Sequence, residues 1–428
     1  METIQPINNM PKFIIQGGGR LTGEIAVKGA KNAALKIIPA ALLSDQPLTI
    51  KNLPAIEDID RALDIIKDLG GQVALHNDEC QINCSTLNRH ELTPALANKL
   101  RASIMFVGPL LARQGEVKFP HPGGCVIGAG TRPIDLFLEG FTALGARVSF
   151  KNGVYHLQAK KLKGGEYFFT TVSVTGTESL MMTAVLAEGR TILKNCALEP
   201  EIVALADYLN TQGARISGAG TPTIIIDGVK TIDAGTCKII PDRIEAGTFA
   251  ILAAATNSPI TITNCQPAHL ESLLAIFKKI GVKFSVGPDW LKIISADKLQ
   301  AYSLKTHEYP GFPTDLQSPY VVLMTQAHGA SLIHETIYDR RLLFTDMLTQ
   351  MGANIIMCDP HRVVINGPTP LVGHKLTSPD LRAGISMVIA GLIAAGTTEI
   401  DNIYQIDRGY AAIDERLRQL GARLERYD

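Results

Sequence analysis

Six nearly uninterrupted apolar segments recur along the chain. They occupy residues 33–43, 102–112, 179–187, 246–255, 319–327 and 384–395. A helix that is apolar on every side is stable only when its whole surface is buried. The segments therefore predict six buried helices. Three such helices form the centre of a layer that sheets and outer helices enclose.

A short strand pattern follows each apolar segment, and a polar loop and an amphipathic helical pattern come next. The strand patterns lie at 48–52, 117–119, 191–195, 260–264, 331–335 and 398–402. Each amphipathic pattern ends at a glycine: Gly70, Gly145, Gly213, Gly281, Gly352 or Gly421. Glycine suits this place because the residue after a helix often adopts the left-handed conformation. Strand patterns such as 146–150 and 422–426 follow these glycines.

The six glycines lie 68–75 residues apart, so one structural unit repeats six times. Each copy alternates helix and strand, which is typical of an α/β fold. Six copies divide evenly into two groups of three. The sequence therefore predicts two α/β barrel domains, each built from three repeats of the same unit.

Composition excludes several functional classes. The 428 residues are 46% hydrophobic and 19% charged, values that are typical of globular proteins. Lys+Arg and Asp+Glu are both 41, so the formal net charge is zero and no general attraction to nucleic acid is expected. No apolar run approaches the roughly 20 residues that span a bilayer, and residues 1–13 do not resemble a secretory signal. We therefore expect no nucleic-acid partner and no membrane insertion.

The cysteines and histidines favour a reduced cytoplasmic protein without a metal site. The seven cysteines are scattered at positions 80, 84, 125, 196, 237, 265 and 358. This distribution does not suggest a disulfide framework. Cys80 and Cys84 lack a second pair at zinc spacing, and the ten histidines form no H-E-x-x-H motif.

The segment 120–146, PHPGGCVIGAGTRPIDLFLEGFTALGA, carries the clearest candidate chemistry. It places Cys125 on a Pro/Gly loop ahead of Arg132 and an amphipathic helix. Gly123 and Gly124 allow the backbone to turn sharply and to approach a ligand, while free N–H groups at a helix start favour anions. Arg132 would stabilise an anionic ligand or a thiolate.

Several further motifs resemble one enzyme family. They are VKGAKNAAL at 27–35, LRASIMFVGPLLAR at 100–113, PGGCVIG at 122–128, RPIDL at 132–136, LAEG at 186–189, FPTDLQ at 312–317, SPDLRAG at 378–384 and IDRGY at 406–410. In this order they resemble the UDP-N-acetylglucosamine 1-carboxyvinyltransferases. These enolpyruvyl transferases open bacterial peptidoglycan synthesis, on which cell-wall formation, cell shape and division depend.

The resemblance implies a fold and a pair of substrates. The fold would be two inside-out α/β barrels, one over residues 30–238 and the other combining 1–29 with 239–428. The substrates, phosphoenolpyruvate and UDP-N-acetylglucosamine, would bind in the cleft between the barrels. Neither a cofactor nor a metal ion is implied.

The resemblance also implies two catalytic residues. Cys125 would donate a proton to the methylene carbon of phosphoenolpyruvate, although nearby arginines also favour a thiolate that attacks the substrate. Asp315 would accept the proton of the sugar 3-hydroxyl, and a neighbouring substrate phosphate would raise the pKa of its carboxyl group. Without the resemblance, Asp315 would be interpreted as a helix N-cap.

The remaining implied residues bind the two substrates. Lys31 and Asn32 would contact phosphoenolpyruvate and the sugar. Arg132 and Arg408 would bind the phosphoenolpyruvate anion, because planar guanidinium groups match phosphate and carboxylate oxygens. Arg101, Arg341 and Arg382 would line the same positive cleft. The UDP-sugar would be held by Arg132, Pro133, Ile134, Asp135, Leu136, Ser173, Val174 and Ile337.

Two alternatives remain open. The first is 5-enolpyruvylshikimate-3-phosphate synthase, although its usual G-S-K-S is replaced here by residues 29–32, GAKN, and it lacks the PGGC motif. The second is a non-catalytic paralogue of the same fold. Two extra residues between Gly128 and Arg132 favour this second interpretation, because they lengthen the loop that carries Cys125.

Overall fold

The structure is a computed structural model that describes residues 11–123 and 134–428. The chain forms two compact units. Unit 1 contains Met1–Val27, Arg243–His307 and Gly311–Asp428, and unit 2 contains Lys28–Asp242 and Glu308–Pro310.

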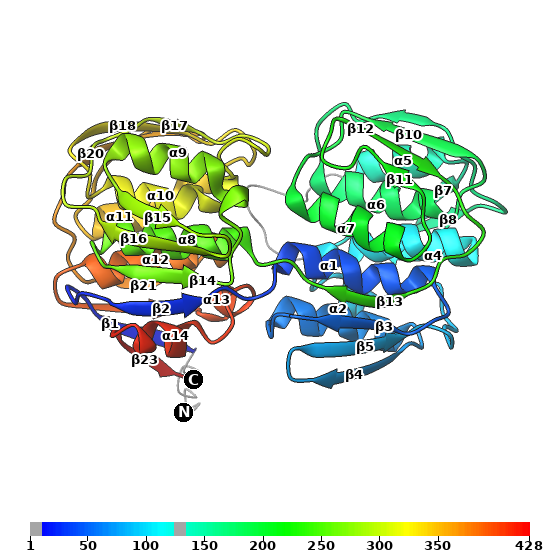
Figure 1. The fold of residues 1–428 in the computed structure, drawn as a ribbon, viewed down its shortest axis with the longest axis horizontal. Coiled ribbons are helices and arrows are strands. Elements are labelled where there is room, and N and C mark those ends of the chain that lie inside the picture. Colours follow the sequence, from blue (N-terminus) through cyan, green and yellow to red (C-terminus); the bar gives the residue numbers. More distant parts are fainter. Residues whose placement is uncertain (1–10, 124–133) are drawn as a thin grey trace, which may run out of the picture. The chain divides into compact units, whose positions relative to one another are not determined.

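The six predicted buried helices are present. They are α1 (Lys31–Ala40), α4 (Val107–Gln114) and α6 (Val174–Val185) in unit 2, and α8 (Arg243–Ala255), α10 (Gln317–Met324) and α12 (Leu381–Ile393) in unit 1. The three helices of unit 1 pack against one another, as Figure 1 shows. Phe249, Tyr320 and Val388, one from each helix, are almost completely buried between them. Burial on every side explains why these helices carry no polar face.

One of these helices differs from its prediction. The apolar segment 102–112 begins as the 3₁₀ helix η2 (Arg101–Phe106), and the α-helix starts only at Val107. Pro109 is the third residue of α4, where its missing N–H is not needed. An α-helix from Arg101 would require that N–H to bond the carbonyl of Met105. The 3₁₀ turns η1 (Ala41–Leu43) and η4 (Thr314–Leu316) adjoin α1 and α10.

The outer helices end at the predicted glycines. These helices are α2 (Glu57–Asp68), α5 (Asp135–Ala143), α7 (Pro200–Thr211), α9 (Glu271–Ile280), α11 (Thr345–Gln350) and α14 (Ile413–Gln419). The six glycines that follow them have φ angles between 89° and 100°. Residues with a Cβ rarely adopt this region, so the structure confirms the predicted helix ends. Shorter helices are α3 (Pro94–Ala97), η3 (Pro267–Leu270), η5 (Arg341–Phe344) and α13 (Tyr404–Asp407).

Three sheets pack against the helices of unit 1. Their strand orders are β15-β16-β14-β2, β17-β18-β20-β19 and β21-β22-β1-β23. The strands are β1 (Lys12–Gln16), β2 (Gly23–Ala26), β14 (Ile260–Thr263), β15 (Lys283–Val286), β16 (Trp290–Ser295), β17 (Leu304–Lys305), β18 (Gly329–His334), β19 (Asn354–Asp359), β20 (Arg362–Gly367), β21 (Lys375–Thr377), β22 (Thr397–Asp401) and β23 (Arg423–Tyr427).

Unit 2 has three further sheets, with strand orders β13-β3-β5-β4, β11-β12-β10-β9 and β6-β8-β7 within the described residues. The strands are β3 (Leu48–Lys51), β4 (Gln72–His76), β5 (Glu79–Asn83), β6 (Glu116–Pro120), β7 (Arg147–Lys151), β8 (Val154–Gln158), β9 (Glu166–Phe168), β10 (Arg190–Lys194), β11 (Ile216–Ser217), β12 (Thr223–Asp227) and β13 (Gly235–Lys238).

Two strands are exchanged between repeats. In three repeats the strand before a buried helix pairs in parallel with the strand after it, as β9 does with β10 across α6. The strands before α1 and α8 depart from this pattern. β2 precedes α1 but pairs with β14, for example Ile25 opposite Ile262. β13 precedes α8 but pairs with β3. This exchange assigns the N-terminal strands to unit 1.

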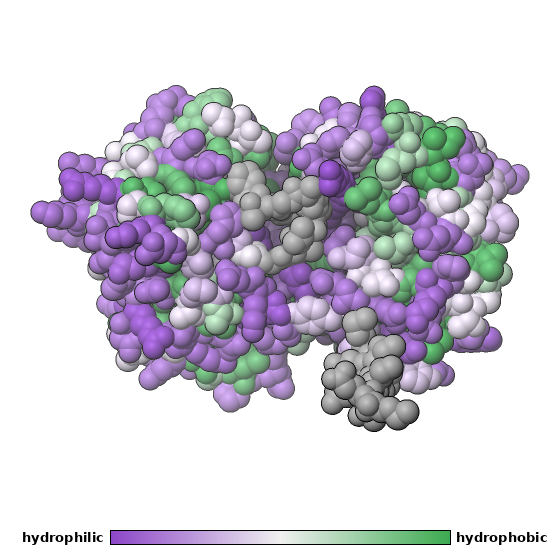
Figure 2. Space-filling model, turned by 180° about the vertical axis from the view of Figure 1, so that it is seen from behind, coloured by the Kyte–Doolittle hydropathy of each residue, from purple (hydrophilic) through white to green (hydrophobic). Residues whose placement is uncertain are grey.

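Hydrophilic residues predominate on the face drawn in Figure 2, where apolar residues appear in small patches. Among the described residues, no helix combines the length and apolar character needed to cross a membrane.

Candidate active site

The loop that carries the candidate thiol is described only at its start. Cys125, Arg132 and Pro133 lie outside the described residues. Ahead of them, Gly123 donates its backbone N–H to the Ala97 carbonyl at 3.2 Å, and a Cβ on Gly123 would overlap the carbonyl of Asn98. Arg101 Nη1 donates to the Pro122 carbonyl at 3.3 Å. Arg101 therefore contacts the segment just ahead of Cys125, and its place in a substrate site stays a prediction.

Lys31 is oriented by two aspartates from other parts of unit 2. Its Nζ lies 2.9 Å from Asp58 Oδ2, and its backbone N–H donates to Asp242 Oδ2 at 3.1 Å. Ala30 precedes α1 and has no capping side chain, so Asp242 satisfies one of the free N–H groups of this helix. The Lys31 side chain is about one-tenth exposed, and Asn32 follows it in α1. Asp58 was not among the predicted site residues, although it belongs to the acidic first turn of α2.

The described unit 2 residues that are expected to hold the UDP-sugar lie at helix starts. Ser173 caps α6 by accepting the N–H of Gly176 at 3.1 Å, and Val174 is the first residue of that helix. Ile134 precedes α5, and Asp135 and Leu136 begin it. The Tyr167 hydroxyl donates to the Leu136 carbonyl at 3.1 Å and so fixes the first turn of α5. Their contacts with a nucleotide sugar stay predictions.

In unit 1 the structure brings three predicted site residues together. Arg341 Nη2 lies 3.0 Å from Asp315 Oδ1, and Arg382 Nη2 lies 2.8 Å from Asp315 Oδ2. Both arginine side chains are almost fully buried, while a quarter of the Asp315 side chain is exposed. Neither η4 nor α10 has a capping side chain, so the N-cap interpretation of Asp315 is wrong.

The two arginines determine the charge of Asp315. Burial raises the pKa of its carboxyl group, but the charges of Arg382 and Arg341 and their hydrogen bonds outweigh burial and hold the pKa well below its ordinary value. This direction is opposite to the raised pKa that we expect beside a substrate phosphate. Asp315 is therefore a firmly ionised carboxylate whose basicity depends on how closely the arginines stay paired with it.

A chain of hydrogen bonds supports Arg382. Its Nη1 donates to the Tyr410 hydroxyl at 3.2 Å, and that hydroxyl lies 2.9 Å from the Thr248 hydroxyl. Thr248 donates its single proton to the Ile244 carbonyl, so Tyr410 is the donor to Thr248. Tyr410 was not among the predicted site residues, although the motif IDRGY contains it.

The two other predicted residues of unit 1 have local partners. Arg408 Nη1 donates to the side-chain oxygen of Gln405 at 3.1 Å. Ile337 donates its backbone N–H to Glu335 Oε1 at 2.8 Å. Their contacts with phosphoenolpyruvate and the nucleotide sugar stay predictions.

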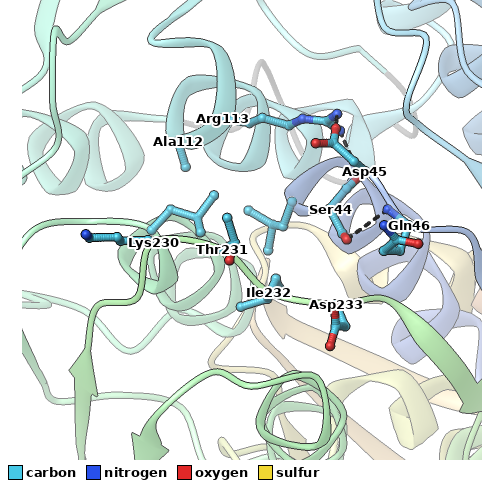
Figure 3. Close-up of a pocket in the computed structure, with 11 residues that line it drawn as sticks. Ser44, Asp45, Gln46, Ala112, Arg113, Lys230, Thr231, Ile232 and Asp233 are labelled. Carbon is cyan, nitrogen blue, oxygen red and sulfur yellow. Dashed lines mark hydrogen bonds and ion pairs between the residues drawn. The ribbon is translucent and has the colours of Figure 1, made fainter.

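A pocket of about 410 Å³ lies elsewhere in unit 2, where α1, α4 and α6 end. Figure 3 shows Arg113 paired with Asp45 among the residues that line it. Arg113 also donates to the carbonyls of Leu42 and Ser44 at 3.1 and 2.9 Å. Because these partners occupy the guanidinium group, we interpret Arg113 as a structural residue that stabilises the end of η1. None of the predicted site residues is among the described residues that line this pocket.

Metal ligation has no support within residues 11–123 and 134–428. No group of three or more His, Cys, Asp or Glu side chains lies there in a position to hold a metal ion.

Comparison with known proteins identifies relatives over nearly the whole chain. A family model described as EPSP synthase (3-phosphoshikimate 1-carboxyvinyltransferase) matches residues 15–417. UDP-N-acetylglucosamine 1-carboxyvinyltransferase of Halothermothrix orenii is 46% identical over 413 residues, which cover 96% of this chain and 99% of the relative. The enzyme of the same name from Desulfosudis oleivorans is 43% identical over 417 residues, which cover 97% and 99%.

Solved structures share the fold at lower identity. The enolpyruvyl transferase NikO from Streptomyces tendae has a TM-score of 0.88 and 23% identity, over 98% of this chain and 99% of that one. EPSP synthase from Acinetobacter baumannii has a TM-score of 0.73 and 17% identity, over 98% and 100%. These similarities establish a mixed α/β fold of the EPSP synthase type. From the sequence relatives it follows that the chain belongs to the UDP-N-acetylglucosamine 1-carboxyvinyltransferase family of enolpyruvyl transferases.

Proposed function

We propose that the protein transfers the enolpyruvyl group of phosphoenolpyruvate to the 3-hydroxyl of UDP-N-acetylglucosamine and releases phosphate. The observation that carries this proposal is the identity of 43–46% with relatives of that name over nearly the full length of both chains. The cluster of Asp315 with two buried arginines supports it, because the reaction needs a carboxylate base beside groups that bind anions.

The proposed chemistry proceeds by addition and elimination. A proton from Cys125 adds to the methylene carbon of phosphoenolpyruvate, and the neighbouring carbon becomes electrophilic. The sugar 3-oxygen attacks that carbon and forms a C–O bond while Asp315 accepts the hydroxyl proton. The bond from carbon to the phosphate oxygen then breaks, and the phosphate leaves with the proton that Asp315 had accepted. The new methyl group returns a proton to the Cys125 thiolate, which restores the thiol. The products are the enolpyruvyl ether and phosphate.

Asp315 gains basicity in this scheme when its arginines turn to the substrate. A carboxylate paired with two guanidinium groups is a weak base, because both cations favour its charged form. An anionic substrate competes for Arg341 and Arg382 and adds a negative charge beside Asp315. Both effects raise the pKa of Asp315 at the step that needs a base.

The finer architecture belongs to the same proposal. We infer two inside-out barrels, one over residues 30–238 and the other over 1–29 with 239–428, whose substrate cleft is formed by both. Cys125, Lys31, Asn32, Arg101, Arg132, Arg408 and the residues at the starts of α5 and α6 would contribute from their respective barrels. We also propose a cytoplasmic location, where phosphoenolpyruvate is available and cysteines stay reduced.

The second candidate is transfer to 3-phosphoshikimate, which the description of the matching family model favours. Phosphate release separates the two. The purified protein is incubated with phosphoenolpyruvate and either UDP-N-acetylglucosamine or 3-phosphoshikimate. Release with the nucleotide sugar alone is expected, and release with 3-phosphoshikimate alone would support the second candidate. Binding of UDP-N-acetylglucosamine without release from either mixture would indicate a non-catalytic paralogue.

A further inference from the structure

Glu335 is a fully buried carboxylate that directly follows β18. Its Oε1 accepts the backbone N–H groups of Ile337 at 2.8 Å and Tyr338 at 3.1 Å. Its Oε2 accepts the hydroxyl of Thr314 at 2.9 Å. Three local donors thus satisfy the two oxygens of this buried side chain. Glu335 therefore connects the 337–338 backbone to the residue next to Asp315.

Thr314 passes this connection to Arg341. The Thr314 oxygen accepts Arg341 Nη1 at 2.8 Å while its proton goes to Glu335. Because a hydroxyl has one proton, the order of donation is fixed: Arg341 donates to Thr314, and Thr314 donates to Glu335. Arg341 also uses Nη2 to bind Asp315. One guanidinium group is thus held at two neighbouring residues, Thr314 and Asp315.

The orientation of Arg341 depends on these two contacts. Its Nε is buried and has no hydrogen-bond partner among the described residues. The charged groups that act on Arg341 are Asp315, Glu335 and Asp380, and the Tyr338 ring lies 5.2 Å from its guanidinium carbon. If the Thr314 contact is lost, the bond to Asp315 is the one described hydrogen bond that still orients the guanidinium group, because Nε has no partner among the described residues.

We propose that Glu335 is a positioning residue, which acts through Thr314 to fix Arg341 against Asp315 and, through the 337–338 backbone, fixes the segment of Ile337. This inference rests on the proposed function, in which Asp315 is the base and Ile337 contacts the nucleotide sugar. A single carboxylate, that of Glu335, thereby positions both the arginine that pairs with the base and the segment that contacts the nucleotide sugar.

Three substitutions separate the two connections of Glu335, one through Thr314 to Arg341 and the other to the 337–338 backbone. Thr314→Val keeps the shape but removes the hydroxyl, so Arg341 loses its anchor while the backbone contacts of Glu335 remain. Thr314→Ser restores the hydroxyl. Glu335→Gln disturbs both connections. The amide oxygen can accept from the 337–338 backbone only if the NH₂ group faces Thr314. The proton of the Thr314 hydroxyl then lacks an acceptor.

The readout is the pH profile of turnover with phosphoenolpyruvate and UDP-N-acetylglucosamine. Arg341 and Arg382 are the cations that face Asp315, and loosening Arg341 raises the pKa of Asp315. For Thr314→Val we expect kcat to fall roughly 10- to 10²-fold and the acid limb of the profile to move to higher pH. Thr314→Ser should restore both. Glu335→Gln should additionally raise KM for the nucleotide sugar.

Glu245→Gln is the matched control. Glu245 is a buried carboxylate of unit 1 whose Oε1 lies 2.6 Å from Arg416 Nη1. This substitution should lower the melting temperature without moving the acid limb. A Thr314→Val enzyme with the wild-type acid limb and kcat would overturn the proposal.

A second measurement needs no turnover. In a double-mutant cycle of chemical unfolding, Thr314→Val and Glu335→Gln should be strongly non-additive, because both break the same hydrogen bond. Additive effects would overturn the proposal even if the wild-type protein transferred nothing. A wild-type protein that releases no phosphate but shows coupling between these residues would contradict only the proposed function.

Discussion

Arg382 and Asp315 form an ion pair of 2.8 Å although 67 residues separate them in the sequence. Arg341 binds the other oxygen of the same carboxylate. The candidate base is thus the meeting point of η4, η5 and α12. This arrangement keeps Asp315 charged and places two buried cations where an anionic substrate would compete for them.

Asp315→Asn tests the role of this carboxylate. We expect turnover to fall by roughly 10²-fold or more, because an amide cannot accept the hydroxyl proton. Stability should also fall, by about 1–3 kcal/mol, because two buried arginines lose their counter-ion.

Steady-state rates and urea unfolding measure the two effects of Asp315→Asn. Asp359→Asn, which breaks an exposed ion pair with Arg362, is the control and should change neither quantity much. Near-normal turnover in folded Asp315→Asn would assign Asp315 a structural role.

Tyr410→Phe tests the support of Arg382. Phenylalanine keeps the ring that lies 5.7 Å from the guanidinium carbon but removes the hydroxyl that accepts from Nη1. We expect a loss of stability of about 1–2 kcal/mol and a severalfold lower kcat, because Arg382 loses one of its anchors. An unchanged rate together with lower stability would show that Tyr410 only packs the core.

Selective alkylation tests Cys125. Five other cysteines are buried, and burial raises the pKa of Cys84 and Cys237 to about 12 and that of Cys80, Cys196 and Cys265 to about 11. A phosphonate epoxide that resembles phosphoenolpyruvate should therefore modify Cys125 and spare these five. Peptide mass spectrometry reads the result, with the exposed Cys358 as the internal comparison. Equal modification of Cys125 and Cys358 would argue against a specially activated thiol.

Glu178 predicts an unusual dependence of stability on pH. It is fully buried in α6, and Lys36 Nζ lies 3.3 Å from its Oε2. Burial raises the pKa of Glu178 to about 8, and the charge of Lys36 offsets this only in part. The folded chain therefore holds a proton that the unfolded chain releases above about pH 4.3. Stability should fall as the pH rises from there to about 8.

Melting temperatures between pH 5 and pH 9 measure the contribution of Glu178. Glu178→Gln should flatten the decline, because the substituted group no longer titrates. Glu188→Gln, at an exposed ion pair with Lys161, should keep the wild-type slope. Parallel slopes for the wild type and Glu178→Gln would refute the assignment.

The sequence allowed prediction of those features that depend on local patterns. The six buried helices follow from uniform apolarity, and the helix ends follow from glycines such as Gly70 and Gly421, whose φ angles are positive as expected. The exchange of β2 and β13 was not predictable in this way. Both strands carry similar patterns, and their partners β14 and β3 are chosen by pairing across long sequence distances.

In the candidate site, too, the identity of residues could be predicted from the sequence, whereas their contacts depend on the fold. Asp315 and Arg382 lie in the motifs of the resemblance, and Arg341 was implied by the resemblance itself. Only the fold shows that the three form one cluster and that the arginines lower the pKa of the carboxyl group. Glu335 was missed because a glutamate after a strand usually faces solvent. The end of the 331–335 pattern, where a charge follows apolar residues, was the one available signal.

Product analysis tests the central claim most directly. The purified protein is incubated with phosphoenolpyruvate and UDP-N-acetylglucosamine, and the nucleotide sugar is examined by proton NMR and mass spectrometry. Our account predicts an enolpyruvyl ether at the 3-oxygen, with two vinyl protons, in equal amount to the phosphate released. An unchanged nucleotide sugar, in a preparation that converts 3-phosphoshikimate to its enolpyruvyl ether, would contradict it.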